Sequence, residues 1–270
     1  MAKGKKRKLD HQTSKIQIKK LKQKPSKEIK SASDSGKSSG TTISFEAEDR
    51  ILLVGEGDFS FAKSIVEHHR CCDVTATCLD SKDDLYVKYK PQAEENIQYL
   101  EGESQTVLYN VDATKLDSIK SLKSSERFDK IIFNFPHIGG KSTDVNRQVR
   151  SNQELLVKFF KSASQLLKAS GSIIVTLFES EPYTLWNIRD LARHSGLEVQ
   201  RSFKFQPSAY PAYRHSRTLG NIDGGGGWKG ENREARSYEF RQKSVQTSPK
   251  DSKEVNKRRR RSDDSDSDND

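Results

Sequence analysis

The stretch RILLVGEGDFSFAKSI (residues 50–65) decides the fold that this sequence predicts. Its first part, residues 50–55, is a compact apolar run that ends at a glycine, which is typical of a buried parallel strand. From residue 60 to residue 69, Phe61 and Ile65 fall on one face of a predicted helix. A strand that turns tightly into a helix is the first unit of a doubly wound α/β domain.

Strands and helices continue to alternate after this unit. Further strands are predicted at residues 73–80, 106–114, 128–135, 172–179, 197–205 and 236–242. Further helices are predicted at residues 91–100, 152–170 and 184–196. This order indicates a doubly wound, Rossmann-like sheet that is mostly parallel and has an antiparallel C-terminal strand. Ligands of such sheets bind at the carboxyl ends of the strands.

Three segments follow from the composition. Residues 1–42 and 242–270 are polar and charged without a periodic apolar pattern, so we expect a disordered basic tail and a disordered tail with basic then acidic runs. Residues 43–241 form the predicted Rossmann-like domain, which has an ordinary size for one α/β domain.

The positive charge is concentrated in the first tail. Residues 1–30 carry 12 Lys and Arg against 2 Asp and Glu, and the whole chain carries 48 against 38, so both have a net charge of +10. Runs such as KGKKRK and NKRRRR favour nucleic-acid contact and recognition by the nuclear import machinery. The alternative is a solvated tail that only aids solubility.

Other classes of protein are disfavoured. The three cysteines, Cys71, Cys72 and Cys78, have neither the spacing of a metal site nor an even-numbered disulfide framework, so we expect a reducing compartment and no metal. Because no apolar run approaches 18 residues and the N-terminus lacks an apolar signal core, we expect no membrane association and no secretion.

The turn after the first strand has the residues of a nucleotide site. Gly55 and Gly57 would allow a tight turn and a close approach of ligand to backbone, with Ser60 as the third small residue. Glu56 and Asp58 make this turn acidic, which repels a pyrophosphate and suits a cation. S-Adenosylmethionine carries a sulfonium and an ammonium, so we expect it rather than NAD. The alternative is an ordinary strand-to-helix turn.

Two carboxylates at the ends of later strands extend the predicted cofactor site. Asp80 ends the second strand, 23 positions after Gly57, where a carboxylate commonly binds ribose hydroxyls. Asp112 follows the third strand and could accept a hydrogen bond from an adenine amino group. With Phe59 of the glycine turn, these residues complete the expected cofactor-binding set.

The tetrapeptide NFPH (residues 134–137) follows the fourth strand, where the methyl group lies in the doubly wound methyltransferase plan. It resembles the [N/D]-P-P-[F/Y] motif of amino-directed methyltransferases, but Phe135 separates the expected prolines. A uracil ring nitrogen fits better as the acceptor. His137 could remove its proton as a general base, Asn134 could hydrogen-bond the base edge and Phe135 could stack on it. The alternative is that His137 only braces the loop.

Five stretches together resemble the eukaryotic 25S rRNA (uridine-N3)-methyltransferase-like family: ILLVGEGDFSFAKSI, TCLDS, FDKIIFNFPHIGGK, VTLFESEPYTLWNI and YPAYRHSRT. The resemblance implies a class I methyltransferase fold and S-adenosylmethionine as the methyl donor. It also implies a uridine of large-subunit rRNA as the substrate, free or in a pre-ribosomal particle, and a role in ribosome biogenesis in the nucleus and nucleolus. Ala212 departs from the glycine expected at that position.

Two loops are candidates for substrate binding. Residues 138–152 read as a glycine-hinged loop with Lys141, Arg147 and Arg150, and residues 206–234 form a long insertion. The insertion mixes aromatic and basic side chains, as binding of unpaired RNA requires: Tyr210, Tyr213, Arg214, His215 and Arg217. Four glycines at 224–227 suggest that it could close over RNA. The alternative is a flexible surface insertion.

Two other functions remain open from the sequence. The first is a non-catalytic RNA-binding ribosome-assembly factor that retains a vestigial nucleotide pocket. The second is an NAD-linked oxidoreductase, which the acidic glycine turn and the lack of an evident hydride-transfer constellation disfavour.

Overall fold

The computed structural model describes residues 42–123, 126–139, 144–221 and 230–243. The two predicted tails fall almost entirely outside these ranges, as do Lys141 and the four glycines at 224–227. Within the described ranges, no helix is both long enough and apolar enough to cross a membrane.

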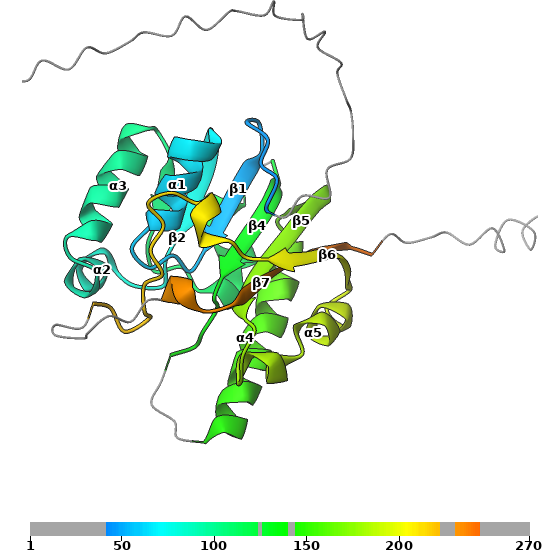
Figure 1. The fold of residues 1–270 in the computed structure, drawn as a ribbon. Coiled ribbons are helices and arrows are strands. Elements are labelled where there is room, and N and C mark those ends of the chain that lie inside the picture. Colours follow the sequence, from blue (N-terminus) through cyan, green and yellow to red (C-terminus); the bar gives the residue numbers. More distant parts are fainter. Residues whose placement is uncertain (1–41, 124–125, 140–143, 222–229, 244–270) are drawn as a thin grey trace, which may run out of the picture. The chain divides into compact units, whose positions relative to one another are not determined.

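One seven-stranded sheet organises the described residues (Figure 1). Its strands lie in the order β3-β2-β1-β4-β5-β7-β6. Neighbours from β3 to β5 pair in parallel, whereas β7 pairs antiparallel with both β5 and β6. The predicted mostly parallel sheet with an antiparallel C-terminal strand is therefore confirmed. The strands are β1 Arg50–Val54, β2 Asp73–Thr77, β3 Thr106–Leu108, β4 Phe128–Asn134, β5 Leu167–Phe178, β6 Leu197–Lys204 and β7 Ala235–Gln242.

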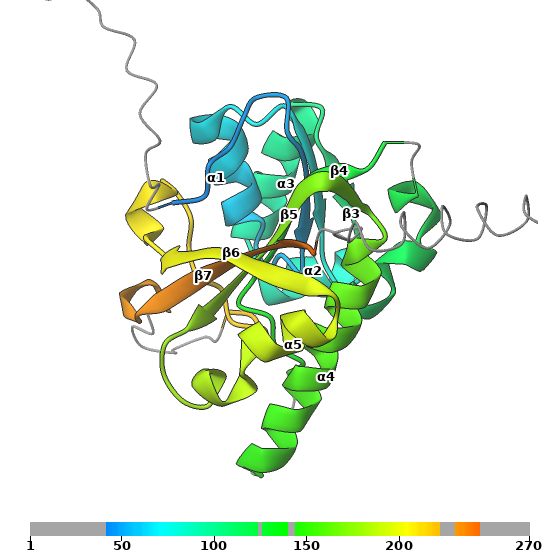
Figure 2. The ribbon, with the colours of Figure 1, turned by 90° about the vertical axis from the view of Figure 1, so that its right-hand side faces the viewer.

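Helices cover both faces of this sheet (Figures 1 and 2). They are α1 Ser60–His69, α2 Lys82–Lys88, α3 Gln92–Gly102, α4 Val145–Ser164 and α5 Ile188–His194. One core contains α1, α2 and α3 side chains with Ile51 and Leu53 of β1, and the other contains α4 and α5 side chains with Leu52 and Val54. Successive β1 residues thus point to opposite faces, which explains why this strand reads as a continuous apolar run.

The helix predicted at residues 152–170 has different ends in the structure. It begins at Val145, where the Asp144 side chain caps it by accepting a hydrogen bond from the Arg147 N–H, and it ends at Ser164. The apolar spacing continues through Leu167, but Leu167 belongs to β5 and pairs with β4. Tertiary pairing has overridden the helical pattern there.

Gly171, the residue after the predicted helix, lies inside β5. The β4–β5 register shifts around it, because Phe128 pairs with Leu167 whereas Lys130 pairs with Ser172. A Cβ atom on Gly171 would lie 2.8 Å from the Asp129 carbonyl oxygen. The glycine therefore permits a close approach of two strands rather than a helix end.

Candidate active site

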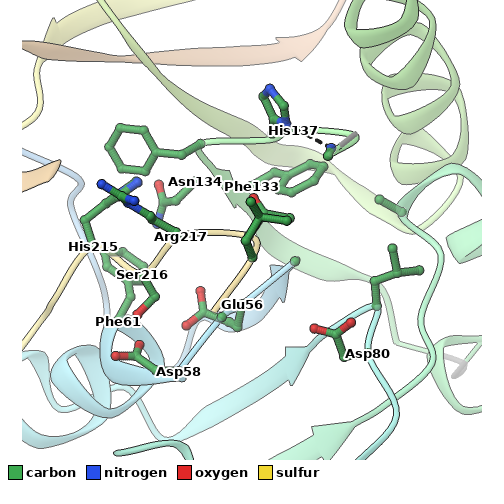
Figure 3. Close-up of a pocket in the computed structure, with 18 of the residues that line it drawn as sticks. Glu56, Asp58, Phe61, Asp80, Phe133, Asn134, His137, His215, Ser216 and Arg217 are labelled. Carbon is green, nitrogen blue, oxygen red and sulfur yellow. Dashed lines mark hydrogen bonds between the residues drawn. The ribbon is translucent and has the colours of Figure 1, made fainter. Parts of the chain in front are cut away.

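A cavity of about 770 Å³ lies where the strands of the parallel part of the sheet end (Figure 3). The turns after β1, β2 and β4 and the connection between β6 and β7 all contribute to its wall. In Figure 3, Glu56, Asp58 and Asp80 occupy one side and Asn134 and His137 the other. Most of the predicted site residues line it: Gly55, Glu56, Gly57, Asp58, Asp80, Asp112, Asn134, Phe135, His137, Tyr213, Arg214, His215 and Arg217.

The glycine turn has the conformation that its sequence requires. Gly55 has a φ of +71°, a left-handed conformation that L side chains rarely adopt. A Cβ atom there would also lie 2.5 Å from the Phe133 ring, and one on Gly57 would lie 3.3 Å from Ser216 Cβ. Both glycines therefore keep the backbone close to neighbouring groups and leave the cavity side of the turn uncovered.

The two acidic residues of this turn have unusual acid strengths. Burial raises the pKa of Glu56 to about 8, opposed by the hydrogen bond from the Ala62 N–H and increased by the charge of Asp58. Burial also raises the pKa of Asp58, although hydrogen bonds from Ser60 and Ser216 oppose the shift. The sequence predicted an acidic turn that suits a cation, whereas in the structure Glu56 is mostly protonated at neutral pH. A nearby cation would favour its ionised form.

The two carboxylates after β2 and β3 are already engaged. Asp80 Oδ1 accepts a hydrogen bond from Lys88 Nζ at 2.5 Å, which leaves its second oxygen for a ligand. Asp112 caps a 3₁₀ helix by accepting from the Thr114 N–H at 2.8 Å and hydroxyl at 2.7 Å. Burial would raise the pKa of Asp112, but these hydrogen bonds lower it overall. No motif in the sequence indicates Lys88; its signal is its place at the end of α2, the helix that follows Asp80.

Two predicted site residues lie in the core instead. Phe59 has a φ of 61° and its side chain is fully buried, so it shapes the turn without lining the cavity. Tyr210 is 2% exposed, and its ring packs on Phe61 and Phe205. The predicted contact of Tyr210 with RNA is therefore disfavoured, because the alternation of aromatic and basic residues does not reveal which side chains point inward.

Residues 213–221, here called the strap, belong to the β6–β7 connection. They line the cavity and reach the end of α2. The Ser60 hydroxyl donates to the Arg214 carbonyl at 3.2 Å and accepts from its N–H at 3.0 Å. The Tyr89 hydroxyl donates to the Arg217 carbonyl at 2.8 Å. The Asn221 N–H donates to the Lys88 carbonyl at 2.7 Å. These backbone contacts fix the strap as a wall of the cavity, and nothing local in the sequence marked Tyr89 or Asn221 as its anchors.

Side chains at the start of the strap bond to one another. The Tyr213 hydroxyl and His215 Nδ1 are 2.9 Å apart, and the His215 N–H donates to Glu231 at 2.6 Å. The Phe135 and His215 rings pack in a T-shaped arrangement, with ring centroids 4.3 Å apart. Burial lowers the pKa of His215 to about 4, opposed by Glu231 and increased by Arg233. This neutral histidine therefore joins the strap to the NFPH turn and carries no positive charge for RNA.

The NFPH turn leaves β4 through a strained residue. Phe135 has a φ of 51°, a left-handed conformation whose strain is typically about 1–3 kcal/mol for a residue other than glycine. Its N–H donates to the Thr176 carbonyl at 2.9 Å. The Thr176 hydroxyl also donates to Asn134 Oδ1 at 2.8 Å. Thr176 thus holds both the backbone of the turn and the amide that precedes it.

His137 is neutral, and its protonation site is defined. Its Nδ1 accepts a hydrogen bond from the Gly139 N–H at 2.8 Å, so the ring proton lies on Nε2. Burial lowers the pKa of this imidazole, which keeps it uncharged at neutral pH. With one nitrogen accepting and the other protonated, the ring has no free lone pair. The predicted general-base role is therefore disfavoured, and His137 can act as a hydrogen-bond donor.

Basic residues of the predicted 138–152 loop lie elsewhere than expected. Arg147 and Arg150 are exposed on the first turns of α4, and Lys141 lies outside the described residues. The buried Asn152 side chain accepts from the Ile138 N–H at 3.1 Å, which joins α4 to the cavity loop. The described residues contain no cluster of three or more His, Cys, Asp or Glu side chains able to hold a metal ion.

The strand order, the inserted antiparallel β7 and a cavity above β1, β2 and β4 define a Rossmann-like methyltransferase of class I. The chain belongs to the family described as rRNA (uridine-N3-)-methyltransferase BTM5-like, whose sequence model matches residues 52–217.

Individual proteins are similar to this chain over different shares of their own length. The 25S rRNA (uridine(2634)-N(3))-methyltransferase of Saccharomyces cerevisiae is 32% identical over 85% of this chain and 82% of its own length. Heavy metal-associated isoprenylated plant protein 41 of Arabidopsis thaliana is 37% identical over 64% of this chain but only 34% of its own length. Among solved structures, NSun6 from Pyrococcus horikoshii aligns over 73% of this chain and 48% of its own, with 15% identity and a TM-score of 0.46.

Proposed function

We propose that this protein methylates N3 of a uridine in large-subunit rRNA, with S-adenosylmethionine as the methyl donor. The observation that carries the proposal is a single cavity that brings together a carboxylate-lined side and the NFPH turn. The family and the yeast relative, whose name specifies a uridine N3 in 25S rRNA, support this choice of substrate.

The carboxylate-lined side suits the donor. Asp80 would hold the ribose hydroxyls through its second oxygen, and Asp112 would approach the adenine. Glu56 and Asp58 would face the cationic amino-acid end, where a positive ligand offsets the cost of burying their charges. When bound, the donor supplies an electrophilic methyl group on a sulfonium.

The NFPH side suits a uracil. Its N3 proton leaves to solvent water, and the electron pair left on N3 forms the bond to the methyl carbon. The pair of the broken carbon–sulfur bond stays on sulfur, so the products are N3-methyluridine and a neutral thioether. The Asn134 amide and His137 Nε2 carry the N–H groups of this turn that could hydrogen-bond the carbonyl oxygens beside N3. Since a base inside a duplex cannot enter the cavity, the target would be unpaired or flipped out.

The first turns of α4 would bind the RNA backbone. Arg147 and Arg150 are exposed there, and Asn152 joins the same helix to the loop that follows His137. Figure 1 shows this end of α4 extending beyond the sheet. Two arginines on such an extension can contact phosphates while the base enters the cavity.

The proposed cellular setting rests on the tails and the family. Basic runs at both ends would direct nuclear import, and a uridine of large-subunit rRNA implies work in the nucleolus on rRNA or a pre-ribosomal particle. The role would be in ribosome biogenesis.

Methylation of purified large-subunit rRNA tests the proposal directly. With isotopically labelled donor, we expect the label in 3-methyluridine when the nucleosides are separated by mass spectrometry. Label in a different nucleoside would overturn the substrate. Donor binding in a calorimeter without methylation of rRNA or pre-ribosomes would favour the alternative, a ribosome-assembly factor with a vestigial pocket.

A further inference from the structure

Three polar side chains form a continuous row across three strands beside the cavity. Thr176 of β5 pairs with Asn134 of β4 on one side and with Ser237 of β7 on the other. The Thr176 hydroxyl lies 2.8 Å from Asn134 Oδ1 and 2.9 Å from Ser237 Oγ. Thr176 and Ser237 are both fully buried. Polar groups placed in a sheet interior with such complementary spacing constrain one another strongly.

The protons in this row have one arrangement. Asn134 Oδ1 is a carbonyl oxygen and can only accept, so the Thr176 hydroxyl proton points at it. Thr176 Oγ1 must then accept from Ser237, whose hydroxyl has no other hydrogen-bond partner within the described residues. The direction of donation therefore runs from Ser237 through Thr176 to Asn134.

This arrangement leaves the N–H groups of the Asn134 amide to be satisfied, whereas its oxygen already accepts from Thr176. Asn134 Nδ2 exposes less than 1 Å² and has no hydrogen-bond partner in the part of the chain that the structure describes. A buried N–H group without a partner is costly, and a ligand that supplies an acceptor removes that cost. Because the atom is covered, an acceptor reaches it only after the groups over it move.

We infer that Thr176 and Ser237 are positioning residues that fix the orientation of the Asn134 amide and leave its N–H groups as the unpaired donors, so that the site selects a base with a carbonyl oxygen beside the methylated nitrogen. This inference rests on the proposed function and specifies how its base is chosen. An exocyclic amino group would need an acceptor, but Asn134 Oδ1 already accepts from Thr176, and the unpaired atom of this amide within the described residues is the nitrogen. Uracil has carbonyl oxygens on both sides of N3, whereas cytosine has an amino group on one side.

The same arrangement assists the chemistry. When the N3 proton leaves to water, the negative charge spreads onto the neighbouring carbonyl oxygens, so a hydrogen bond to either oxygen becomes stronger. A fixed donor therefore lowers the pH at which N3 becomes nucleophilic. Removal of one such fixed donor from an enzyme site typically slows the reaction about 10²- to 10³-fold. Loss of a residue that only orients the donor should cost less.

The test uses two substitutions at Thr176 that differ in one hydroxyl group. Thr176→Val keeps the shape and removes the proton that holds Asn134 Oδ1, whereas Thr176→Ser keeps that proton. Single-turnover methylation of an rRNA fragment is followed from pH 6 to pH 10. We expect about a tenfold slower reaction for Thr176→Val at neutral pH, a rate profile displaced to higher pH, and substantial rescue in Thr176→Ser. Ser237→Ala should displace the profile in the same direction by a smaller amount.

Donor binding and thermal unfolding separate positioning from stability. A merely structural role would lower stability without displacing the pH profile. If the wild type methylates uridine and Thr176→Val has the same pH–rate profile, this inference is overturned and the proposed function still stands. If Thr176→Val does not fold, Ser237→Ala decides the question by the same profile. If the wild type methylates no rRNA at any pH, the proposed function itself is contradicted.

RNA with sulfur in place of one carbonyl oxygen tests base selection. Sulfur is a poorer hydrogen-bond acceptor than oxygen. Substitution of the oxygen that Asn134 contacts should therefore slow methylation strongly in the wild type. The same substitution should slow methylation only slightly in Thr176→Val, where the Asn134 amide is no longer held. Equal losses in both proteins at both oxygens would overturn the role assigned to Asn134.

Discussion

The ammonium nitrogen of Lys88 lies 2.5 Å from Oδ1 of Asp80, on the wall of the cavity just after β2. The pairing joins the end of a strand to the last turn of α2, eight residues further along the chain. It orients the carboxylate while leaving its second oxygen for a ligand. The same helix end receives the strap, because the Lys88 carbonyl accepts from Asn221.

Asp80→Ala should weaken donor binding with little effect on the fold. Hydrogen bonds to a charged group contribute about 1.5–3 kcal/mol, so we expect about a 10- to 100-fold loss of S-adenosylmethionine affinity by calorimetry. Asp83→Ala is the matched control, since Asp83 is an exposed carboxylate on α2 that does not line the cavity. Equal affinities for Asp80→Ala and Asp83→Ala would contradict the assigned donor site.

Glu56 should release a proton when a cationic donor binds. Its pKa of about 8 means that it is protonated at neutral pH, and a nearby cation favours the charged form. Donor affinity should therefore increase as pH rises toward 8 and then level off. Calorimetry at pH 7 in two buffers with different ionisation heats measures the released proton. Glu56→Gln should bind without that release, and a buffer-independent heat in the wild type would refute the coupling.

The same pKa shift has a consequence for stability without a ligand. Because the folded protein holds this proton more tightly than the unfolded chain does, the contribution of Glu56 to the unfolding free energy decreases as pH rises from about 4.5 to about 8. Glu56→Gln should remove that part of the pH dependence in denaturant titrations.

Gly220→Ala should loosen the strap. Gly220 has a φ of +86°, and a Cβ atom there would lie 2.6 Å from the Lys88 carbonyl oxygen. Both effects oppose the docked conformation, so we expect several-fold faster donor dissociation in stopped-flow measurements. Gly102→Ala is the control, since a Cβ atom there meets no atom within 4 Å and Gly102 ends α3. If both variants release the donor at the wild-type rate, the strap does not retain it.

The fold was largely predictable from the sequence because most strands and helices have a recognisable local pattern of apolar residues and turn residues. The β1 run and the glycines after it need no distant partner to be recognised, and Gly55 indeed has the left-handed backbone that its place suggested. The end of α4 was predicted wrongly because Leu167 fits the helical period and the β5 strand equally well. Only its pairing with Phe128 decides between them.

The site was predictable where a single turn defines it and not where distant segments meet. Asp80 and Asn134 were found because strand ends converge in this fold. Lys88, Thr176 and the anchors of the strap were missed because their roles depend on contacts over many residues, such as 128 between Tyr89 and Arg217. The His137 tautomer depends on one backbone N–H, which no residue pattern encodes.

Tyr210→Ala should affect stability and not RNA binding. The ring is buried against Phe61 and Phe205, and removal of a large aromatic side chain from a core typically costs about 3–5 kcal/mol. Denaturant titration measures the loss. Val87→Ala is the control, because Val87 is 74% exposed and should change stability by less than about 0.5 kcal/mol. Weakened RNA binding in a Tyr210 variant that remains folded would instead support a contact between this residue and RNA.

The exposed arginines of α4 should set the affinity for RNA and its dependence on salt. A contact with a phosphate releases a counterion, so each arginine that makes one adds about 0.7 to the slope of log affinity against log salt for single-stranded RNA. Arg147→Ala with Arg150→Ala should weaken binding of an rRNA fragment and reduce this slope by about 1.4, without changing donor affinity. Lys158→Ala is the matched control, because Lys158 lies on the same helix but pairs with Glu154 at 2.6 Å. Filter binding between low and physiological salt gives both quantities. If the double variant keeps the wild-type slope, the phosphates are bound elsewhere; if Lys158→Ala lowers the slope equally, the effect reflects total charge and not this end of α4.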